Sequence, residues 1–313
     1  MDRDVILREV GLRDGLQGHG QFMPTADKLR WIGAEAAAGV SEIEVTSYVP
    51  VKLLPQFADA AEVTTQSLRI PGLAVAALVP NLKGAQRGLE LGVHKLNFVM
   101  SVSATHNMKN VRRTREESLA EFRAIVAAIA ELPAGAARPA ICGGLATALG
   151  CSYEGAVPVP EVARWAAALV EAGAQELIVP DTVGYANPRL VKEVFRAVLA
   201  EAGGIPVAAH FHDTRGTGLA NLVAALECGV TRFDASLAGT GGCPFAPGAS
   251  GNIVMEDACY LLESMGLRTG VDLEKLVEVR RILAETLPDL PLEGAIARAG
   301  LPRGYTPAQG AAA

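Results

Sequence analysis

Apolar and polar positions alternate with two different periods along the chain. Short runs rich in aliphatic and β-branched residues are separated by longer stretches in which apolar residues recur with helical spacing. This order is typical of βα units around a parallel sheet. The predicted strands are VILREV (5–10), EIEVTS (42–47), LAVAALV (73–79), KLNFVMSV (95–102), RPAICGGLA (138–146), ELIVP (176–180), PVAAHFH (206–212) and RFDASLA (232–238).

Four stretches between these runs predict long helices. They are TADKLRWIGAEAAAG, REESLAEFRAIVAAIAEL, PEVARWAAALVEAG and NPRLVKEVFRAVLAEAG. In the first of them, Thr25 is placed as an N-cap and Gly39 as a C-cap. One more helix is predicted over 271–287, and the Gly-, Pro- and Ala-rich residues at the end of the chain are expected to be disordered.

Eight strands favour an α/β fold of the (β/α)8 TIM-barrel type with an extra C-terminal helical segment. The alternative is an open doubly wound sheet, which usually carries a G-x-G-x-x-G phosphate loop after its first strand. Here that segment reads GLRDGLQG, which does not match. We therefore expect a catalytic barrel domain over 1–270, with the helix and tail of 271–313 packed on it.

Composition excludes several classes of protein. The chain has 313 residues with 28 basic and 34 acidic side chains, so its net charge of −6 lacks the basic excess of a nucleic-acid-binding protein. The start, MDRDVILREVG, lacks the order of a signal peptide, and no apolar run approaches the roughly 20 residues of a membrane span. We expect a cytoplasmic protein without a nucleic-acid or membrane partner.

The five cysteines do not form a recognisable framework. They are odd in number, widely spaced and without a C-x-x-C pair, which argues against disulfides or a structural zinc site. They are Cys142, Cys151, Cys228, Cys243 and Cys259.

The segment HFHDTRG, at 210–216, carries the first sign of chemistry. On a strand, side chains alternate between faces, so His210 and His212 would point the same way and could share a metal ion. The alternative is a solvated pair of histidines at a strand end. Additional ligands must therefore come from other strands.

Polar residues follow several predicted strands at their carboxyl ends, where a TIM barrel carries its active site. Asp14, His210, His212 and Asn252 form a mixed oxygen and nitrogen set that suits Mg²⁺ or Mn²⁺, although a zinc hydrolase could also use two histidines. Taken one at a time, Asp14 and Asn252 could be turn residues, and Asp181 could be a helix cap. The barrel topology, which brings all these loops to one rim, favours a shared site.

Cys243 lies in a loop, GTGGCPFAPGASG, that has five glycines from Gly239 to Gly251 inclusive. Such a loop can close over a substrate and carry the thiol with it. Burial as an inert side chain is the usual fate of a cysteine. An ordinary thiol is protonated at neutral pH, so Cys243 suits a proton donor as well as a nucleophile.

Seven segments together resemble one known family. EVGLRDGLQ, EVTSYVP, PNLKG, ALGCSYEG, DTVG, HFHDTRG and GTGGCPFAPGASGN occur in the family's order, from about Val5 to the helix after Gly270. On these segments the chain resembles the 3-hydroxy-3-methylglutaryl-CoA (HMG-CoA) lyase family of metal-dependent TIM barrels. The resemblance implies retro-Claisen cleavage of an acyl-CoA substrate to acetyl-CoA and acetoacetate, and a homo-oligomer, expected to be a dimer.

The resemblance also implies roles for single residues. Asp14, His210, His212 and Asn252 would hold Mg²⁺ or Mn²⁺, while Arg13 would bind the thioester oxygen. A histidine of the pair or Asp181 would take the hydroxyl proton. Cys243 would reprotonate the acetyl-CoA carbanion, and Glu44 would orient Arg13 or a metal-bound water.

Some segments depart from the family pattern without removing a proposed ligand or Cys243. Leu12, Arg215 and the segment SVSATHNMKN are examples. They leave open a related 3-hydroxy-acyl-CoA that is longer or differently branched at C3. Two further alternatives are a Claisen-condensing enzyme or 4-hydroxy-2-oxo acid aldolase of the same superfamily, which would lack the GGCP loop, and a barrel that binds acyl-CoA or metal without turnover.

Overall fold

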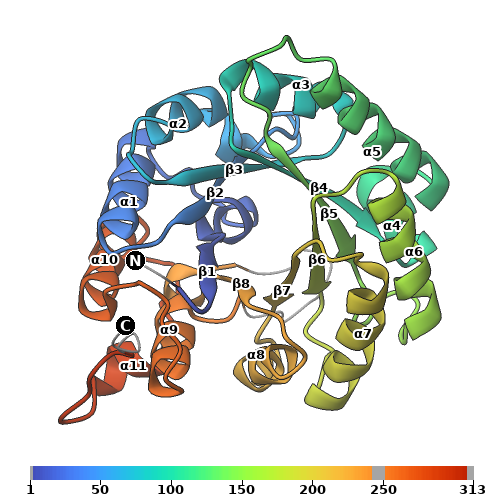
Figure 1. The fold of residues 1–313 in the computed structure, drawn as a ribbon. Helices are drawn as coiled ribbons and strands as arrows, with labels where there is room; N and C mark the ends of the chain where they lie inside the picture. Colours follow the sequence, from blue (N-terminus) through green and yellow to red (C-terminus); the bar gives the residue numbers. More distant parts are fainter. Residues whose placement is uncertain (1–2, 242–250, 309–313) are drawn as a thin grey trace.

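Eight parallel strands close into a barrel in the order of the sequence, β1 to β8, with β8 pairing with β1 (Figure 1). The structure is a computed structural model that describes residues 3–241 and 251–308. The strands are β1 (Ile6–Glu9), β2 (Glu42–Ser47), β3 (Ala74–Val79), β4 (Lys95–Ser101), β5 (Ala140–Ala146), β6 (Glu176–Asp181), β7 (Val207–Phe211) and β8 (Arg232–Ala235). The predicted TIM barrel is therefore confirmed.

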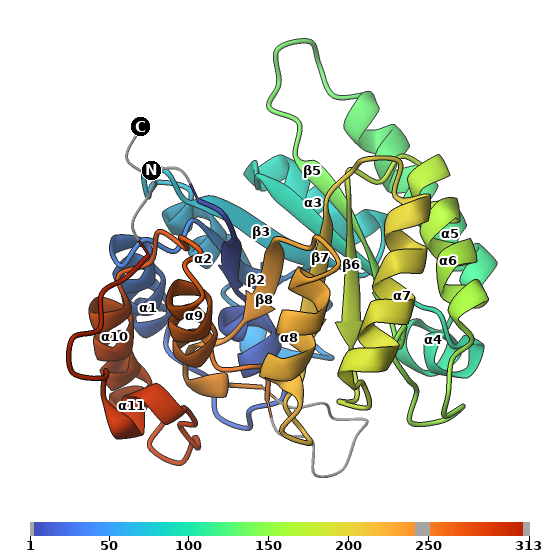
Figure 2. The ribbon, with the colours of Figure 1, turned by 60° about the horizontal axis from the view of Figure 1, so that its bottom comes forward.

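Helices surround the barrel as an outer ring (Figures 1 and 2). They are α1 (Thr25–Ala37), α2 (Ala60–Ser67), α3 (Leu82–Leu91), α4 (Ala104–Val111), α5 (Arg115–Ala130), α6 (Val159–Glu171), α7 (Pro188–Glu201), α8 (Gly218–Leu226), α9 (Met255–Ser264), α10 (Leu273–Thr286) and α11 (Ala295–Ala299). Short helical turns are η1 (Gly11–Gly15), η2 (Pro55–Phe57) and η3 (Leu237–Gly239). None of the helices in these described residues is long and apolar enough to cross a membrane.

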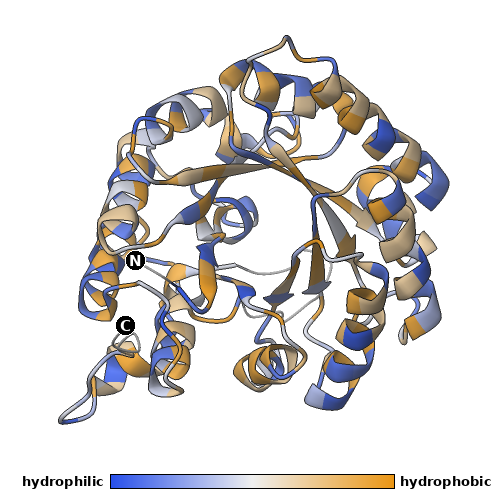
Figure 3. Ribbon diagram, in the orientation of Figure 1, coloured by the Kyte–Doolittle hydropathy of each residue, from blue (hydrophilic) through white to orange (hydrophobic). Residues whose placement is uncertain are grey.

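The hydrophobic core lies between the strands and the helices. Hydrophilic and hydrophobic residues alternate along the outer helices (Figure 3), as amphipathic helices require. Aromatic side chains of the helices pack on the strands, with ring centroids 5.5 Å apart for Phe122 on Phe98 and 6.1 Å apart for Phe195 on Phe211. This apolar layer fixes the strands, whose carboxyl ends carry the candidate site.

The predicted caps of the first helix are wrong by one position each. Pro24 is the N-cap of α1, and the hydroxyl of Thr25 donates to Asp59 Oδ2 at 2.9 Å instead of capping the helix. Ala38 is the C-cap, and Gly39 follows it with φ +102°. Asp59 is a tertiary partner, so the sequence of the helix alone did not reveal it.

Strand β8 is shorter than the predicted run of 232–238. The chain leaves the sheet after Ala235 and enters the turn η3, in which Ala238 has a left-handed φ of +57°. The amide of Leu237 donates to Glu9 Oε2 at 2.9 Å. The buried carboxyl of Glu9 holds the turn. The apolar run at 232–238 did not indicate this contact, because Glu9 is far away in the sequence.

The C-terminal segment packs on the side of the barrel. Helix α10 lies beside α1 and α11 lies beside α9. The amide of Glu293 donates to the carbonyl of Ala238 at 2.9 Å, and the rings of Tyr305 and Tyr260 lie 5.5 Å apart. The division at residue 270 stays a prediction.

Candidate active site

The loop after β1 places Asp14 at the mouth of the barrel. It forms a turn of π-helix, η1, in which the amide of Asp14 donates to the carbonyl of Val10 at 2.6 Å. Glycine is needed in this turn, because a Cβ on Gly11 would lie 2.6 Å from Glu9 Oε1 and 2.9 Å from the ring of Trp31. The close packing aims the Asp14 carboxylate inward, where it is 6% exposed.

Strand β7 carries His210, and His212 follows directly after its last residue, so the two histidines lie in the same place. His210 and His212 are buried, and their Nε2 atoms lie 3.0 Å apart. Asp14 Oδ2 is 3.5 Å from Nε2 of His212 and 4.0 Å from Nε2 of His210. The prediction that the two histidines share a face with Asp14 nearby is confirmed in geometry, and these three residues could hold a metal ion.

Asn252 reaches the same point from the segment before α9. Its backbone pairs with that of His212, while its Nδ2 donates to Asp14 Oδ2 at 2.9 Å and to the carbonyl of Thr240 at 3.0 Å. Its Oδ1 is buried and has no hydrogen-bond partner among the described residues. A buried carbonyl oxygen without a partner beside a carboxylate and two imidazoles fits a divalent cation, which takes such ligands.

The charges around Asp14 favour its anionic form. Burial opposes ionisation, but the charge of Arg13 and the two histidines hold the pKa of Asp14 well below its usual range. Burial also disfavours the cation of His210, but Asp234 and Asp14 raise the pKa of His210 above its ordinary value. The site is therefore anionic at Asp14, as a cation site should be.

Arg13 lies beside the proposed ligands and is held on two sides. Its Nε donates to Glu44 Oε2, and its Nη1 donates to Asp14 Oδ1 at 2.5 Å. Glu44 is in turn held by Asn97 Nδ2, which donates to Glu44 Oε1 at 2.8 Å. The expected contact between Glu44 and Arg13 is thus present, and it fixes the guanidinium at the mouth of the barrel.

Asp181, at the end of β6, is buried and holds the turn that follows. Its Oδ1 accepts from the amide of Tyr185 at 2.9 Å, and its Oδ2 accepts from that of Ala186 at 3.0 Å. Burial raises the pKa of Asp181, and these amides offset part of the rise. Asp181 is therefore not the helix cap that the sequence left open, because Asn187 caps α7; it holds the preceding turn, and its catalytic role stays a prediction. Cys243 lies outside the described residues, so its role also stays a prediction.

Sequence reasoning missed two residues next to the site. Asp234 Oδ2 lies 3.2 Å from Nδ1 of His210, and Gln17 Nε2 donates to Asp14 Oδ1 at 3.0 Å. The signal for Asp234 was a charged residue in the middle of an apolar strand. Gln17 offered no such signal.

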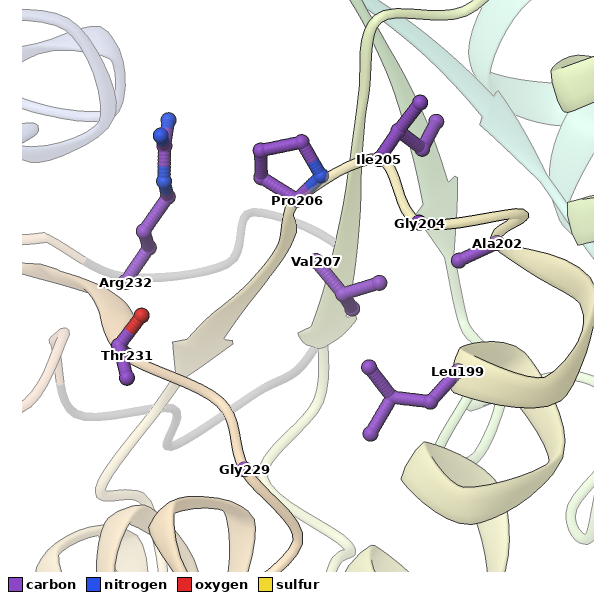
Figure 4. Close-up of a pocket in the computed structure, with 9 residues that line it drawn as sticks. All are labelled: Leu199, Ala202, Gly204, Ile205, Pro206, Val207, Gly229, Thr231 and Arg232. Atoms are coloured by element: carbon purple, nitrogen blue, oxygen red, sulfur yellow. The ribbon is translucent and has the colours of Figure 1, made fainter.

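A small pocket of about 220 Å³ lies at the opposite end of the barrel (Figure 4). It is formed at the start of β7 and β8, by residues such as Pro206, Val207, Thr231 and Arg232. It contains none of the proposed site residues, so we assign the site by its side chains and not by this cavity.

Known proteins are similar to this chain in sequence and in fold. A family model described as HMGL-like matches residues 4–283. The chain belongs to the HMGL-like family. Hydroxymethylglutaryl-CoA lyase YngG of Bacillus subtilis is 43% identical over 285 residues, which cover 91% of this chain and 94% of that protein. The family resemblance inferred from the motifs is therefore confirmed.

Solved structures of the HMGL-like family have the same fold. The crystal structure of a B. subtilis HMG-CoA lyase has a TM-score of 0.88 and 41% identity, covering 95% of this chain and 98% of that one. An HMG-CoA lyase from A. baumannii, in complex with coenzyme A and 3-methylmalate, has a TM-score of 0.89 and 39% identity, covering 97% of each chain. These relatives are carbon–carbon lyases by name.

Proposed function

We propose that this chain is a divalent-metal-dependent carbon–carbon lyase that cleaves HMG-CoA to acetyl-CoA and acetoacetate. The observation that carries the proposal is the facing pair of Nε2 atoms of His210 and His212 beside Asp14 and the unpartnered Oδ1 of Asn252. High identity over most of the length of HMG-CoA lyases supports the same reaction, and it does not favour a condensing enzyme or an aldolase.

The four proposed ligands, Asp14, His210, His212 and Asn252, would hold Mg²⁺ or Mn²⁺ with the substrate. The ion would supply Lewis acidity, which lowers the pKa of the substrate's tertiary hydroxyl. Arg13 is held through Nε and Nη1 by Glu44 and Asp14. Its Nη2 is left to donate to the thioester oxygen, where negative charge develops as the C2–C3 bond breaks.

Asp181 is the better candidate for the general base. As proposed ligands, His210 and His212 would donate their Nε2 lone pairs to the metal ion, so these nitrogens could not accept the substrate proton. Asp181 is not a proposed ligand and keeps free lone pairs. Asp181 is the register partner of Phe211, the residue between the two histidines, and burial raises its pKa, which makes it a stronger base. The proton of the C3 hydroxyl passes to Asp181, and the C2–C3 electrons form the enolate of acetyl-CoA.

Cys243 would complete the reaction by giving its thiol proton to C2 of the enolate. Cys243→Ala should therefore lower turnover by orders of magnitude while leaving Mn²⁺ affinity unchanged. Cys228→Ala, a half-buried cysteine on another part of the barrel, is the control and should keep its turnover. Near wild-type turnover of Cys243→Ala would remove this thiol from the mechanism.

The proposed activity is tested by incubating the protein with HMG-CoA and Mg²⁺ or Mn²⁺, with and without a chelator. Release of both acetyl-CoA and acetoacetate that stops on chelation is the expected result. Turnover only of a 3-hydroxy-acyl-CoA with a longer or differently branched C3 would keep the chemistry but change the substrate. Turnover of none of these with the metal bound would refute the proposal.

The dimer and the cytoplasmic location rest on the family resemblance and on composition. Light scattering of the protein after gel filtration would measure its mass in solution. We expect twice the chain mass of 32.6 kDa, and the mass of a single chain would refute the dimer.

A further inference from the structure

Charged side chains fill part of the barrel interior, below the proposed metal site. Bulky branched residues usually occupy this region of a TIM barrel. In this chain, cations and anions come from β1, β2, β4, β6 and β8. The interior charged group consists of Arg8, Glu42, Lys95, Glu176, Arg232 and Asp234.

The interior charged group is balanced, with three cations and three anions in direct contact. Lys95 Nζ lies 2.9 Å from Glu42 Oε1 and 2.6 Å from Glu176 Oε1. Arg232 Nη1 lies 2.7 Å from Glu176 Oε2, and Arg8 Nη1 bonds Glu176 as well. Because each anion has a cation beside it, the interior can hold ionised side chains away from water.

Asp234 connects the interior charged group to the proposed metal site. In the sheet it is the register partner of Arg8 on one side and of His210 on the other. Its Oδ1 accepts from Arg8 Nε at 2.6 Å and lies 2.5 Å from Arg8 Nη2. Its Oδ2 lies 3.2 Å from His210 Nδ1. Arg8 thus occupies one oxygen and leaves the other for the imidazole.

This contact decides which nitrogen of His210 carries the proton. An ionised carboxylate can only accept a hydrogen bond, so the proton must be on Nδ1. Nε2 then has a free lone pair, directed at the point that Asp14 and His212 also face. In the metal-free protein the contact between the two rings would have His212 donating and His210 accepting.

We propose that Asp234, held by Arg8, is a positioning residue that fixes His210 in the Nδ1–H tautomer and so prepares Nε2 as a metal ligand. This inference rests on the metal site proposed above. It assigns to a residue inside the barrel, away from the substrate, a direct effect on metal affinity. An outer carboxylate of this kind usually changes metal affinity by about 10- to 100-fold.

Asp234→Asn tests the inference, with Glu42→Gln as the matched control. Glu42 belongs to the interior charged group, but in the described part of the chain it forms ion pairs with Lys95 and Arg8 and none with His210. Mn²⁺ affinity is measured by electron paramagnetic resonance of free Mn²⁺, with His210→Ala marking the loss of a whole ligand. We expect Asp234→Asn to weaken Mn²⁺ binding by about 10- to 100-fold and Glu42→Gln by less than about 3-fold. Equal weakening in both variants, or none in Asp234→Asn, would overturn the inference.

A measurement on the wild-type chain covers the case in which Asp234→Asn does not fold. Long-range ¹H–¹⁵N spectra of ¹⁵N-histidine-labelled, metal-free protein report which ring nitrogen is protonated, and the spectrum of His210→Gln assigns His210. We expect the Nδ1–H form; an Nε2–H form would overturn the inference. Failure of the wild type to bind Mn²⁺ would instead refute the proposed metal site, so the two failures are distinguishable.

Discussion

Two groups of buried carboxylates lie on opposite sides of the barrel wall, and their protonation differs. Inside the barrel, burial opposes the ionisation of Asp234 and Glu176. The charges of Arg8 and Lys95 nevertheless lower the pKa of each carboxyl to about 2. In the outer carboxyl group, formed by Glu9, Glu35 and Glu256 between strand and helices, burial raises the pKa of all three, that of Glu9 to about 7.

Burial is nearly complete in both groups, so it does not explain the difference. The interior group has three cations. Among the described residues, the outer group is in contact with one cation, Arg280, which bonds Glu256. Burial therefore raises the pKa of Glu9 and of Glu35, and in Glu35 the neighbouring charge of Glu9 raises it further. Glu9 also accepts from the amides of Gly11 and Leu237, so this carboxyl lies under the two turns next to the site. Counter-charge, not depth, decides whether a buried carboxyl is ionised.

Removing Arg8, the central cation of the interior charged group, should have the largest effect on the stability of the folded chain. Arg8→Met would leave Asp234 and Glu176 buried without a partner that they share, and we expect a loss of about 3–5 kcal/mol in the free energy of unfolding. Urea unfolding at pH 7.5 measures it. Arg232→Met is the control, because Arg232 is 31% exposed in its side chain and forms an ion pair only with Glu176 among the described residues. Equal losses in both variants would contradict the central role of Arg8.

Removing Arg280, the cation of the outer carboxyl group, should lower the free energy of unfolding by less. In Arg280→Met, Glu256 loses one charged hydrogen bond but keeps that from the Ala238 amide, and we expect a loss of about 2 kcal/mol near pH 8. The pKa of Glu256 is already raised by burial, and it would rise further without Arg280. Glu256 can then take up a proton at low pH, so the loss should be smaller at pH 5.

The neighbouring residue Arg281, 76% exposed in its side chain, supplies the control for this prediction. Arg281→Met should change stability little at either pH. If Arg280→Met lost the same stability at pH 5 and pH 8, Glu256 would not be responding to its counter-charge.

The smallest effect on stability is expected from the titration of Glu9. The pKa of Glu9 is about 7 in the folded chain, above the ordinary value of 4.5. The folded state therefore binds the proton more tightly, so this stability is fully present below pH 4.5 and is lost as the pH rises through 7. Between pH 6 and pH 7 the wild type should lose about 1 kcal/mol from this source.

Glu9→Gln removes the carboxyl that burial makes titrate near pH 7 in the folded chain. The fall in stability between pH 6 and pH 7 should therefore flatten in this variant, as measured by urea unfolding at each pH. The exposed Glu62→Gln serves as the control and should keep the wild-type slope. An unchanged slope in Glu9→Gln would show that Glu9 is not the group that titrates between pH 6 and pH 7.

Local pattern was enough to predict most strands but not their ends. The run at 42–47 coincides with β2, because its apolar residues and its bounds are local properties. The run at 232–238 overshot β8 by three residues, because Glu9 and a left-handed Ala238 decide where that strand ends. Thr25 failed as a cap for the same kind of reason, since Asp59 takes its hydroxyl.

The sequence by itself determined the barrel, the family and the residue types at its mouth, because periodicity and motifs are local records of strands, helices and ligands. Only the tertiary structure decided that Asp14, His210 and His212 meet within a few ångströms and that Asp234 and Arg8 support His210 from inside the barrel. It also decided that buried carboxyls on the two sides of one wall differ in charge. Such electrostatic effects depend on distances between residues far apart in the chain, which a sequence does not record.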